Sequence, residues 1–369
     1  MTSRERLLTA YRCEQPDGLP IMIRGVRCWD EQWVATRHPS YKPVIDVVAE
    51  YGDYQLGWGL GSGVLLSGTK EAWYSTETVP GEDWNDVLRT LHTPAGELTA
   101  RYKSSNRGLP GLEVEHFVKS LDDIECIASI PYEPLQVDAS GFFALDEMIG
   151  DRGVVMCSIA NPLYTFAMLM GSELLAIWSI EQRDMINEWI AILTERSCDI
   201  LEQEIAAGVG PVFSMLGEEY ITPPLHSAAD FREFCVEPEK QITRRIHDAG
   251  CILHTHCHGP LDGILEDFID LGSDVLHPVE APPLGNVTIE DAKRRLAGHI
   301  CIEGNIQIGD IYAAPTGQII DQVKHTIDVA APGGGYVLAP TASPYTEVLT
   351  DQTVKNYVAM VETAAEYGR

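Results

Sequence analysis

The feature that most constrains the fold is a regular alternation of strand and helix patterns from about residue 150 to the end of the chain. Amphipathic segments with apolar residues at helical spacing, such as 183–206, separate short apolar runs that turn residues bound. The alternation predicts a parallel sheet covered by helices, because parallel neighbours need a crossover connection. The predicted strands of this region are 154–159, 212–216, 251–258, 274–280, 299–303 and 336–339.

A strand at 19–23 and one or two more before residue 150 bring the number of strands close to eight. That number favours a (β/α)8 TIM barrel over an open, doubly wound sheet. Glycine-rich turns and the alternation in GELTARYKSS predict an N-terminal β-rich insertion at 57–115. We therefore expect an α/β chain in which residues 1–369 form a single barrel domain that carries this insertion. No GxGxxG follows a predicted strand and no GxxxxGK[ST] occurs, so no dinucleotide or P-loop site is predicted.

The strongest functional signal is the stretch CILHTHCHGP at 251–260. His254, His256 and His258 recur at every second residue, which places them on one face of a strand. One histidine on an apolar strand is usually a satisfied core residue, but three at alternate positions are harder to explain by packing. Imidazole is a common zinc ligand, and chemistry in β/α folds lies at the carboxyl ends of strands. The alternative is a hydrogen-bonded polar cluster that binds an anionic or polar substrate.

We expect His256 and His258 to bind a divalent metal, most simply zinc, and to act in catalysis together with Glu218. Their Cα atoms lie roughly 6–7 Å apart at about 3.3 Å per residue. Both imidazoles can therefore reach one ion at about 2.0–2.1 Å. Neighbouring strand ends supply further candidate ligands: Glu218, Glu219, His277 and Glu280. Of these we rank Glu218 and His277 first, whereas His254 is deeper in the strand and is expected to support the ligands.

Two arginines follow the first predicted strand and are candidates for substrate binding. Arg24 and Arg27, close to Trp29, could clamp a carboxylate with bidentate hydrogen bonds, or they could form a surface ion-pair set. Glu280 and Asn305 lie at the ends of two later strands, and we include them as substrate-binding candidates.

The charge of the chain excludes some classes of partner. It has 26 Lys and Arg against 55 Asp and Glu, a formal net charge of −29. That balance argues against nucleic acid and against an anionic membrane surface. The nine cysteines show no CxxC pairing, the N-terminus has no signal-peptide core, and no run of about twenty apolar residues is evident. We expect a cytoplasmic protein with reduced thiols, no membrane contact and a small-molecule substrate.

Several motifs together resemble the uroporphyrinogen decarboxylase superfamily. They are the opening SRERLLTAYRCEQPDGLPI and, from residue 118 onward, SLDDIECI, NPLYTFAMLMGSELL, GEEY, the histidine strand, ICIEGNIQIGDIY and PGGGYVLAP. The resemblance implies a TIM barrel, in agreement with the count of strands. It also implies one of two chemistries. Decarboxylases of the family remove carboxyl groups from a porphyrinogen without a cofactor, and zinc methyltransferases move methyl groups between a corrinoid protein and an acceptor.

The two branches differ in their motifs. The decarboxylases carry an early motif close to RQAGRY, and residues 23–29 of this chain read IRGVRCW. We therefore expect that uroporphyrinogen is not the substrate. The methyltransferases carry His-x-Cys-Gly at a strand end and a later Cys. The resemblance places His256 at the family His and His258 at the family Cys, with Thr341 near the position of the later Cys. The implied site is rich in nitrogen and oxygen ligands. A metal ion held by such ligands is a harder Lewis acid and is less suited to activate a soft thiol.

The function that these features predict is a metal-dependent methyltransferase. It would move a methyl group between a small methylated substrate or acceptor and a partner protein that carries a corrinoid. Three alternatives remain: a decarboxylase of a porphyrinogen or other polycarboxylate, a metal-dependent hydrolase or lyase on the same barrel, and a binding protein that has lost the chemistry. A measurement of metal content would distinguish such a binding protein from the metalloenzymes. A measurement of corrinoid-dependent turnover would distinguish methyl transfer from hydrolysis.

Overall fold

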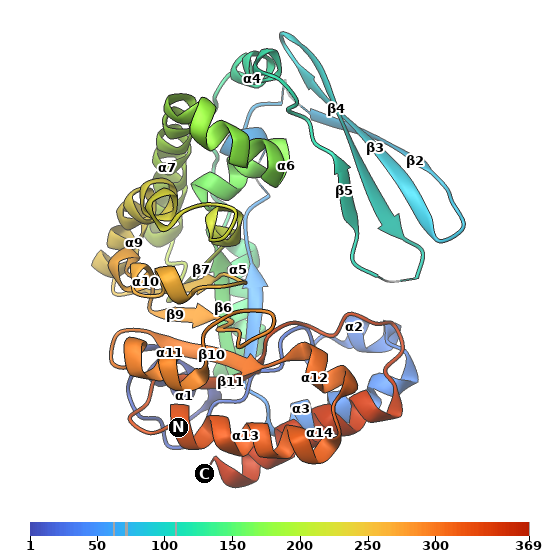
Figure 1. Ribbon diagram of the computed structural model, residues 1–369, viewed down its shortest axis with the longest axis vertical. Coiled ribbons are helices and arrows are strands. Elements are labelled where there is room, and N and C mark those ends of the chain that lie inside the picture. The colour runs from blue at the N-terminus through green and yellow to red at the C-terminus, as the bar shows by residue number, and fades with distance from the viewer. Residues whose placement is uncertain (62, 71–72, 108, 369) are drawn as a thin grey trace.

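The main sheet has seven parallel strands and lies in the middle of the body of the molecule (Figure 1). The computed structural model describes residues 1–61, 63–70, 73–107 and 109–368. The strand order is β1-β6-β7-β8-β9-β10-β11, so consecutive strands of the chain are neighbours in the sheet. The strands are Tyr54–Trp58 (β1), Gly153–Ser158 (β6), Val212–Leu216 (β7), Ile252–His256 (β8), Val275–His277 (β9), Cys301–Ile306 (β10) and Tyr336–Pro340 (β11).

Helices connect these strands and bury an apolar stripe, as in α7, where Ile186, Ile190, Leu193 and Leu201 are buried. The longer helices are α3 (Lys42–Tyr51), α5 (Ser140–Ile149), α6 (Pro162–Glu181), α7 (Arg183–Ala206), α9 (Glu237–Asp248), α11 (Ile289–Leu296), α13 (Thr316–Ala330) and α14 (Asp351–Tyr367). The shorter ones are α2 (Glu31–Thr36), α4 (Leu121–Ala128), α8 (Ala228–Phe231), α10 (Asp267–Leu271) and α12 (Ile308–Ala313). Parallel strands with connecting helices confirm the α/β class.

Helix α6 is the most apolar of the long helices. The side chain of Asn161 caps it by accepting from Tyr164 N at 2.9 Å, and Gly171 interrupts it with a φ of 76°. By length and composition alone α6 could cross a membrane, which differs from our expectation that no segment is long and apolar enough. Half of that segment is buried inside the fold, which is also what a core helix shows.

The segment at 20–22 contacts both edges of the sheet. Ile21 forms a parallel bridge with Leu338 of β11, and its carbonyl accepts from Asp53 N, next to β1, at 2.8 Å. Met22 N donates to Leu338 O at 2.9 Å, and Leu338 N donates to Pro20 O at 3.0 Å. The strand predicted at 19–23 is therefore reduced to a single bridging residue, because proline has no N–H to donate. The described chain has seven regular parallel strands where eight were predicted.

The first helix, α1 (Ser3–Tyr11), packs into the interior of the curled sheet. Its residues Leu7, Ala10 and Tyr11 are buried in one cluster with inward-facing strand residues. The strand partners in this cluster are Met156, Val154, Val212, Ile252, Val275, Cys301, Val337 and Ala339. Most of them lie in the first half of their strands, so α1 fills the amino-terminal side of the sheet interior.

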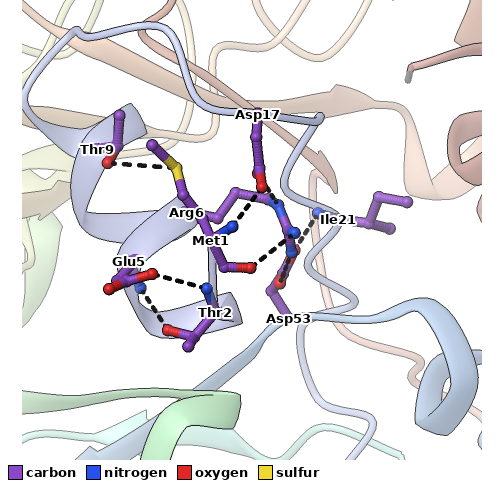
Figure 2. Close-up of polar contacts among 8 residues, drawn as sticks. All are labelled: Met1, Thr2, Glu5, Arg6, Thr9, Asp17, Ile21 and Asp53. Carbon is purple, nitrogen blue, oxygen red and sulfur yellow. Dashed lines mark hydrogen bonds and ion pairs between the residues drawn. The ribbon is translucent and has the colours of Figure 1, made fainter.

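Polar contacts tie α1 to both edges of the sheet (Figure 2). The guanidinium of Arg6 lies 3.1 Å from Asp17 and 3.2 Å from Asp53. Asp53 is buried and accepts from Ile21 N at 2.9 Å. The amino group of Met1 lies 2.5 Å from Asp17. Arg6 and Asp53 therefore join the helix, the bridging segment and the start of β1.

The second sheet is antiparallel and projects from the body as an arm (Figure 1). Its strands, in the order β2-β3-β4-β5, are Trp73–Val79, Trp84–Thr93, Gly96–Ser105 and Leu112–Glu115. This arm confirms the predicted β-rich insertion, although Gly57 and Trp58 belong to β1. Residues 62, 71, 72 and 108 of the predicted range lie outside the described residues. That the whole chain is one domain stays a prediction.

Candidate functional site

Two histidines face each other at the carboxyl ends of neighbouring strands. His256 ends β8 and His277 ends β9, and the two residues are register partners. Their Nδ1 atoms lie 2.8 Å apart, and their rings are nearly parallel at 17° with centroids 4.9 Å apart. Burial lowers the pKa of His256 to about 2 and that of His277 well below the usual range, and the charge of Arg24 adds to both shifts. Both rings are therefore neutral at physiological pH.

The hydrogen bonds of this pair define its tautomers. His277 Nε2 lies 3.2 Å from the carbonyl oxygen of Pro340, which can only accept, so Nε2 carries the proton. In a neutral ring the Nδ1 of His277 then has a lone pair, and His256 Nδ1–H donates to it. The Nε2 of His256 is consequently unprotonated. The pair offers basic nitrogen at the strand ends without carrying charge.

His258 lies just beyond β8 and has a different partner. Its Nδ1 is 3.2 Å from Oε2 of Glu280, a carboxylate that is buried and that also accepts from Gly259 N at 3.1 Å. The rings of His256 and His258 meet edge to face, with centroids 4.8 Å apart. The structure therefore brings together four of the predicted residues: His256, His258, His277 and Glu280.

A buried polar network lies one layer deeper. His254 Nε2 is 3.4 Å from Oε1 of Glu303, and both residues are fully buried. Glu303 Oε2 accepts from Gln55 Nε2 at 2.6 Å and from the hydroxyl of Tyr11 at 3.2 Å. Burial alone would raise the pKa of Glu303, but His254, Arg24 and Gln55 favour the charged form and the net shift is downward. Glu303 is therefore an ionised carboxylate inside the sheet.

Sequence analysis missed Glu303, Gln55 and Tyr11. A usable signal existed for Glu303, because it is an acidic residue in the apolar strand CIEGNI. Charged side chains are almost never fully buried without a partner, so such a residue indicates a polar network. The roles of Tyr11 and Gln55 depend on how α1 and β1 approach Glu303, which no local pattern encodes.

A cavity of about 260 Å³ lies against β7, the neighbour of the histidine-bearing strand β8, and none of the described histidines lines it. Its wall includes Ser214 and Leu216 of β7, the register partners of His254 and His256. Arg24 also lines it and is partly buried, and among the described residues no acceptor lies within hydrogen-bonding distance of its guanidinium. The remaining polar lining consists of Gln55, Asp53 and Ser158, and Trp29 and Tyr54 add aromatic surface.

The other predicted arginine lies outside this cavity. Arg27 is exposed, its guanidinium lies 3.5 Å from Asp30, and it sits 5.9 Å from the ring centroid of Trp33. Gly25, with a φ of 80°, turns the chain between the two arginines. Of the two readings that the sequence left open, the structure places Arg24 in a cavity and Arg27 in a surface ion pair.

The remaining candidates lie apart from the histidine pair. Glu218 is fully buried beside Glu239, whose Oε1 accepts from Asn161 Nδ2 at 2.8 Å. Burial, and next the charge of Glu239, raise the pKa of Glu218 well above its usual range. Burial raises the pKa of the neighbouring residue Glu219, and the charge of His258 opposes this shift. Glu219 is therefore the acidic residue of this turn that interacts electrostatically with His258.

Asn305 lies near the end of β10 and is buried. It lines a second cavity, of about 240 Å³, together with Gln307 and Asp310. Its predicted contact with substrate, like the metal role of Glu218, stays a prediction.

The donor atoms fit a zinc-like metal in part. A metal-bound histidine usually donates its other ring N–H to a carbonyl or carboxylate, as His277 does to Pro340. Two nitrogens on one tetrahedral ion lie roughly 3.3 Å apart at bond lengths of about 2.0–2.1 Å, so the pair would open slightly. Within the described part of the chain, no three His, Cys, Asp or Glu side chains are arranged to hold a metal ion. A third ligand, His258 or Glu280, would have to turn toward the pair.

The position near the expected family cysteine holds no thiol. Thr341 is fully buried, and its hydroxyl accepts from Ile308 N at 3.1 Å. The hydroxyl of Thr341 therefore binds the backbone at the start of α12. Thr341 therefore supplies no sulfur to the histidine pair.

The fold and the site define an α/β protein with imidazoles gathered at the carboxyl ends of a parallel sheet. A sequence model described as "Uroporphyrinogen decarboxylase (URO-D)" matches residues 103–367. The chain belongs to this family of enzymes. Comparison with curated protein sequences finds no match.

Solved structures extend the likeness of fold to the whole chain. A methyltransferase from Methanosarcina mazei is similar with a TM-score of 0.63 and 18% identity, over 100% of this chain and 99% of that one. A muconate lactonizing enzyme from Pseudomonas putida covers 79% of this chain and 77% of its own, at 11% identity and a TM-score of 0.28. The second value is too low to support an argument.

Proposed function

We propose that the protein is a metal-dependent methyltransferase, which moves a methyl group between a small methylated substrate and a corrinoid carried by a partner protein. The observation that carries this proposal is the neutral His256–His277 pair, one strand away from a small cavity that Arg24 lines. Membership of the family and the whole-length likeness to a methyltransferase support it. The same proposal includes work in the cytoplasm, for which the nine free cysteines are suitable.

We also infer that the seven strands and the segment at 20–22 together form a (β/α)8 barrel. The support is that Ile21 is bridged to β11 and accepts from Asp53 N beside β1. In that barrel it would occupy the eighth position, between the two edges of the sheet. In such a barrel the site lies at the carboxyl ends of the strands, where the histidine pair is found.

The size of the cavity favours a small substrate. Ligand pockets have volumes of about 300–1,000 Å³, and this one, at about 260 Å³, is below the lower end of that range. A tetrapyrrole with several carboxylates would need more space and several cationic partners. Arg24 is the cationic residue of the cavity lining, since Arg27 is turned to the surface. A porphyrinogen decarboxylase is therefore a weaker candidate than a small-molecule methyltransferase.

The residues of this chain would divide the work as follows. A metal on His256 and His277 would act as a Lewis acid that stabilises negative charge on the atom that gives or accepts the methyl group. The Pro340 carbonyl fixes the tautomer and orientation of His277. Arg24 would bind an anionic or polar group of the substrate, and the ionised Glu303 helps to keep that guanidinium charged. His258 and Glu280 are placed to complete the ligand set.

The experiment that tests the proposal measures metal and turnover together. Protein purified from zinc-supplemented medium is analysed for metals and assayed for methyl transfer with methylated corrinoid protein. We expect His256→Ala and His277→Ala each to lose most of the bound metal and at least ~10-fold in turnover, because a lost ligand or its support typically costs 10–100-fold. His325→Ala is the matched control, since that histidine is exposed and pairs with Glu290 on the surface.

Two outcomes would contradict the proposal. If both site variants keep full metal content and full turnover, the metal lies elsewhere. If the metal is lost but methyl transfer is undetectable in the parent protein too, and a hydrolysis assay is positive, the alternative hydrolase is correct.

A further inference from the structure

One apolar side chain lies between the cavity and the histidine pair. Leu216 is the last residue of β7, lines the cavity, and is the register partner of His256. Of the described residues that line the cavity, it is the one paired with a histidine of that pair. Neighbouring strands lie about 4.8 Å apart, so Leu216 borders the cavity on one side and His256 on the other.

Leu216 and His256 point to the same, inner face of the sheet. Val212 and Ile252, four residues earlier in the two strands, are register partners and both belong to the cluster that is buried against α1. Side chains alternate along a strand, so residues four positions later return to that face. Leu216 is 37% exposed, which means that its side chain borders open space at the strand end.

The end of β7 holds Leu216 in a defined place. Every residue of β7 pairs in register with β8. The next residue, Gly217, has a φ of 115°, and a Cβ atom there would lie 2.3 Å from Cγ of Tyr164. Glycine is the residue that adopts this conformation without strain and leaves room for the ring. The chain therefore turns directly after Leu216, and the leucine keeps a fixed position relative to His256.

Arg24 and Leu216 give the cavity a cationic part and an apolar wall toward the histidines. Arg24 has no acceptor within hydrogen-bonding distance of its guanidinium among the described residues, so it can bind a negative group of a ligand. A methyl group is apolar and gains from contact with a leucine side chain. A ligand held by Arg24 must therefore extend past Leu216 to bring its methylated atom to the His256–His277 pair.

We propose that Leu216 is a specificity-determining residue, which sets the length of the chain between the negative group of the substrate and its methylated atom. The inference rests on the proposed function, because it takes Arg24 as the anion-binding group and the histidine pair as the reaction centre. The ligand class is a small carboxylate whose far end is apolar. A larger side chain at position 216 shortens the ligand that the site accepts, and a smaller one lengthens it.

The test measures the binding of unreactive carboxylates, so that it does not depend on turnover. Unbranched acids from acetate to octanoate are titrated by calorimetry into the purified full-length protein. For the parent we expect the affinity to rise about fourfold with each buried methylene group and to fall once the chain meets Leu216. Acetate is too short to reach Leu216, so its affinity serves as the internal reference for binding at Arg24.

Two substitutions should shift this length profile in opposite directions. Leu216→Ala should favour longer acids and bind the longest ones at least ~10-fold more tightly than the parent does. Leu216→Phe should favour shorter acids and bind the best ligand of the parent at least ~10-fold more weakly. Acetate should bind equally to all three proteins. Leu88→Ala is the matched control, because Leu88 is 39% exposed on β3 of the arm, and it should keep the parent profile.

The outcomes separate this inference from the proposed function. Opposite shifts with unchanged acetate binding would support the role of Leu216, even in a protein that transfers no methyl group. Identical profiles for the parent and both variants would overturn that role and leave methyl transfer untouched. Equal weakening of all acids in both variants would show a general loosening of the fold and would overturn it as well. Binding of no carboxylate by the parent would overturn both the ligand class and the role of Leu216.

Discussion

Arg24 is a cationic side chain that lines a cavity without an acceptor in hydrogen-bonding distance among the described residues. Burial lowers its pKa, and Glu303 and Tyr11 oppose that shift, so the guanidinium stays charged and available. A residue in this state fits a ligand that brings its own negative or polar group.

We predict that Arg24→Gln lowers kcat/KM about 10–100-fold with small methylated carboxylates, because a hydrogen bond to a charged group contributes about 1.5–3 kcal/mol. Arg27→Gln should change it little, since Arg27 is exposed and pairs with Asp30. The measurement is steady-state kinetics of methyl transfer. Equal effects of the two substitutions would show that Arg24 has no special role in binding.

Glu204 shows what a buried acid without a partner does to stability. Its carboxyl lies among Leu60, Leu66, Ile159 and Ile200, and neither oxygen has a hydrogen-bond partner in the described part of the chain. Burial raises its pKa to about 8 from an ordinary value of 4.5. The native state therefore holds a proton that the unfolded chain releases between these values, and the free energy of unfolding falls as pH rises through that window.

Glu204→Gln should remove this loss of stability at high pH, because glutamine has no proton to release. We expect the variant to be more stable than the parent by about 2–4 kcal/mol at pH 8 and nearly equal to it at pH 4.5, since each unit of pKa shift corresponds to about 1.4 kcal/mol. Denaturant melts at both pH values measure the difference. Glu202→Gln, on the exposed side of the same helix, is the control and should show no such pH dependence.

At the scale of elements, the join between α1, the bridging segment and β1 depends on one buried carboxylate. Asp53→Ala would leave Ile21 N without its acceptor and Arg6 without its buried partner. We expect a loss of about 2–4 kcal/mol in the free energy of unfolding, as for other buried polar groups that lose a partner. Asp17→Ala, which removes the exposed partner of Arg6, should have a small effect. A small effect of both would mean that the bridging segment does not need Asp53.

The elements show where local pattern was sufficient. α7 and β7 have the predicted bounds, because their apolar spacing and flanking turn residues agree. The strand at 251–258 is shorter than predicted and ends at His256, so His258 is a loop residue with a carboxylate partner. β1 was missed because YQLGW runs directly into glycine-rich sequence that resembles the insertion.

At the scale of the whole molecule, the predicted site residues met only in part. His277 reached His256 because consecutive β/α units place their strands side by side, which is a property of the fold and could be predicted. The separation of Arg24 from Arg27 and of Glu218 from Glu219 depends on short turns after strands, whose direction the residue pattern does not specify. Glu303, Gln55 and Tyr11 come from three distant parts of the chain, so only the assembled fold brings them together.

The site is built from two stretches of chain with separate origins. The family match begins at residue 103, and every imidazole of the site lies after it. Arg24, Trp29 and Gln55, which line the cavity, and Tyr11 beneath it all lie before it. In the function that we propose, the metal ligands would therefore come from the later portion of the chain, and the cationic and aromatic lining of the cavity from the earlier one. Relatives that share the later portion but differ in the first hundred residues would then keep the metal ligands and differ in much of the cavity that receives the substrate.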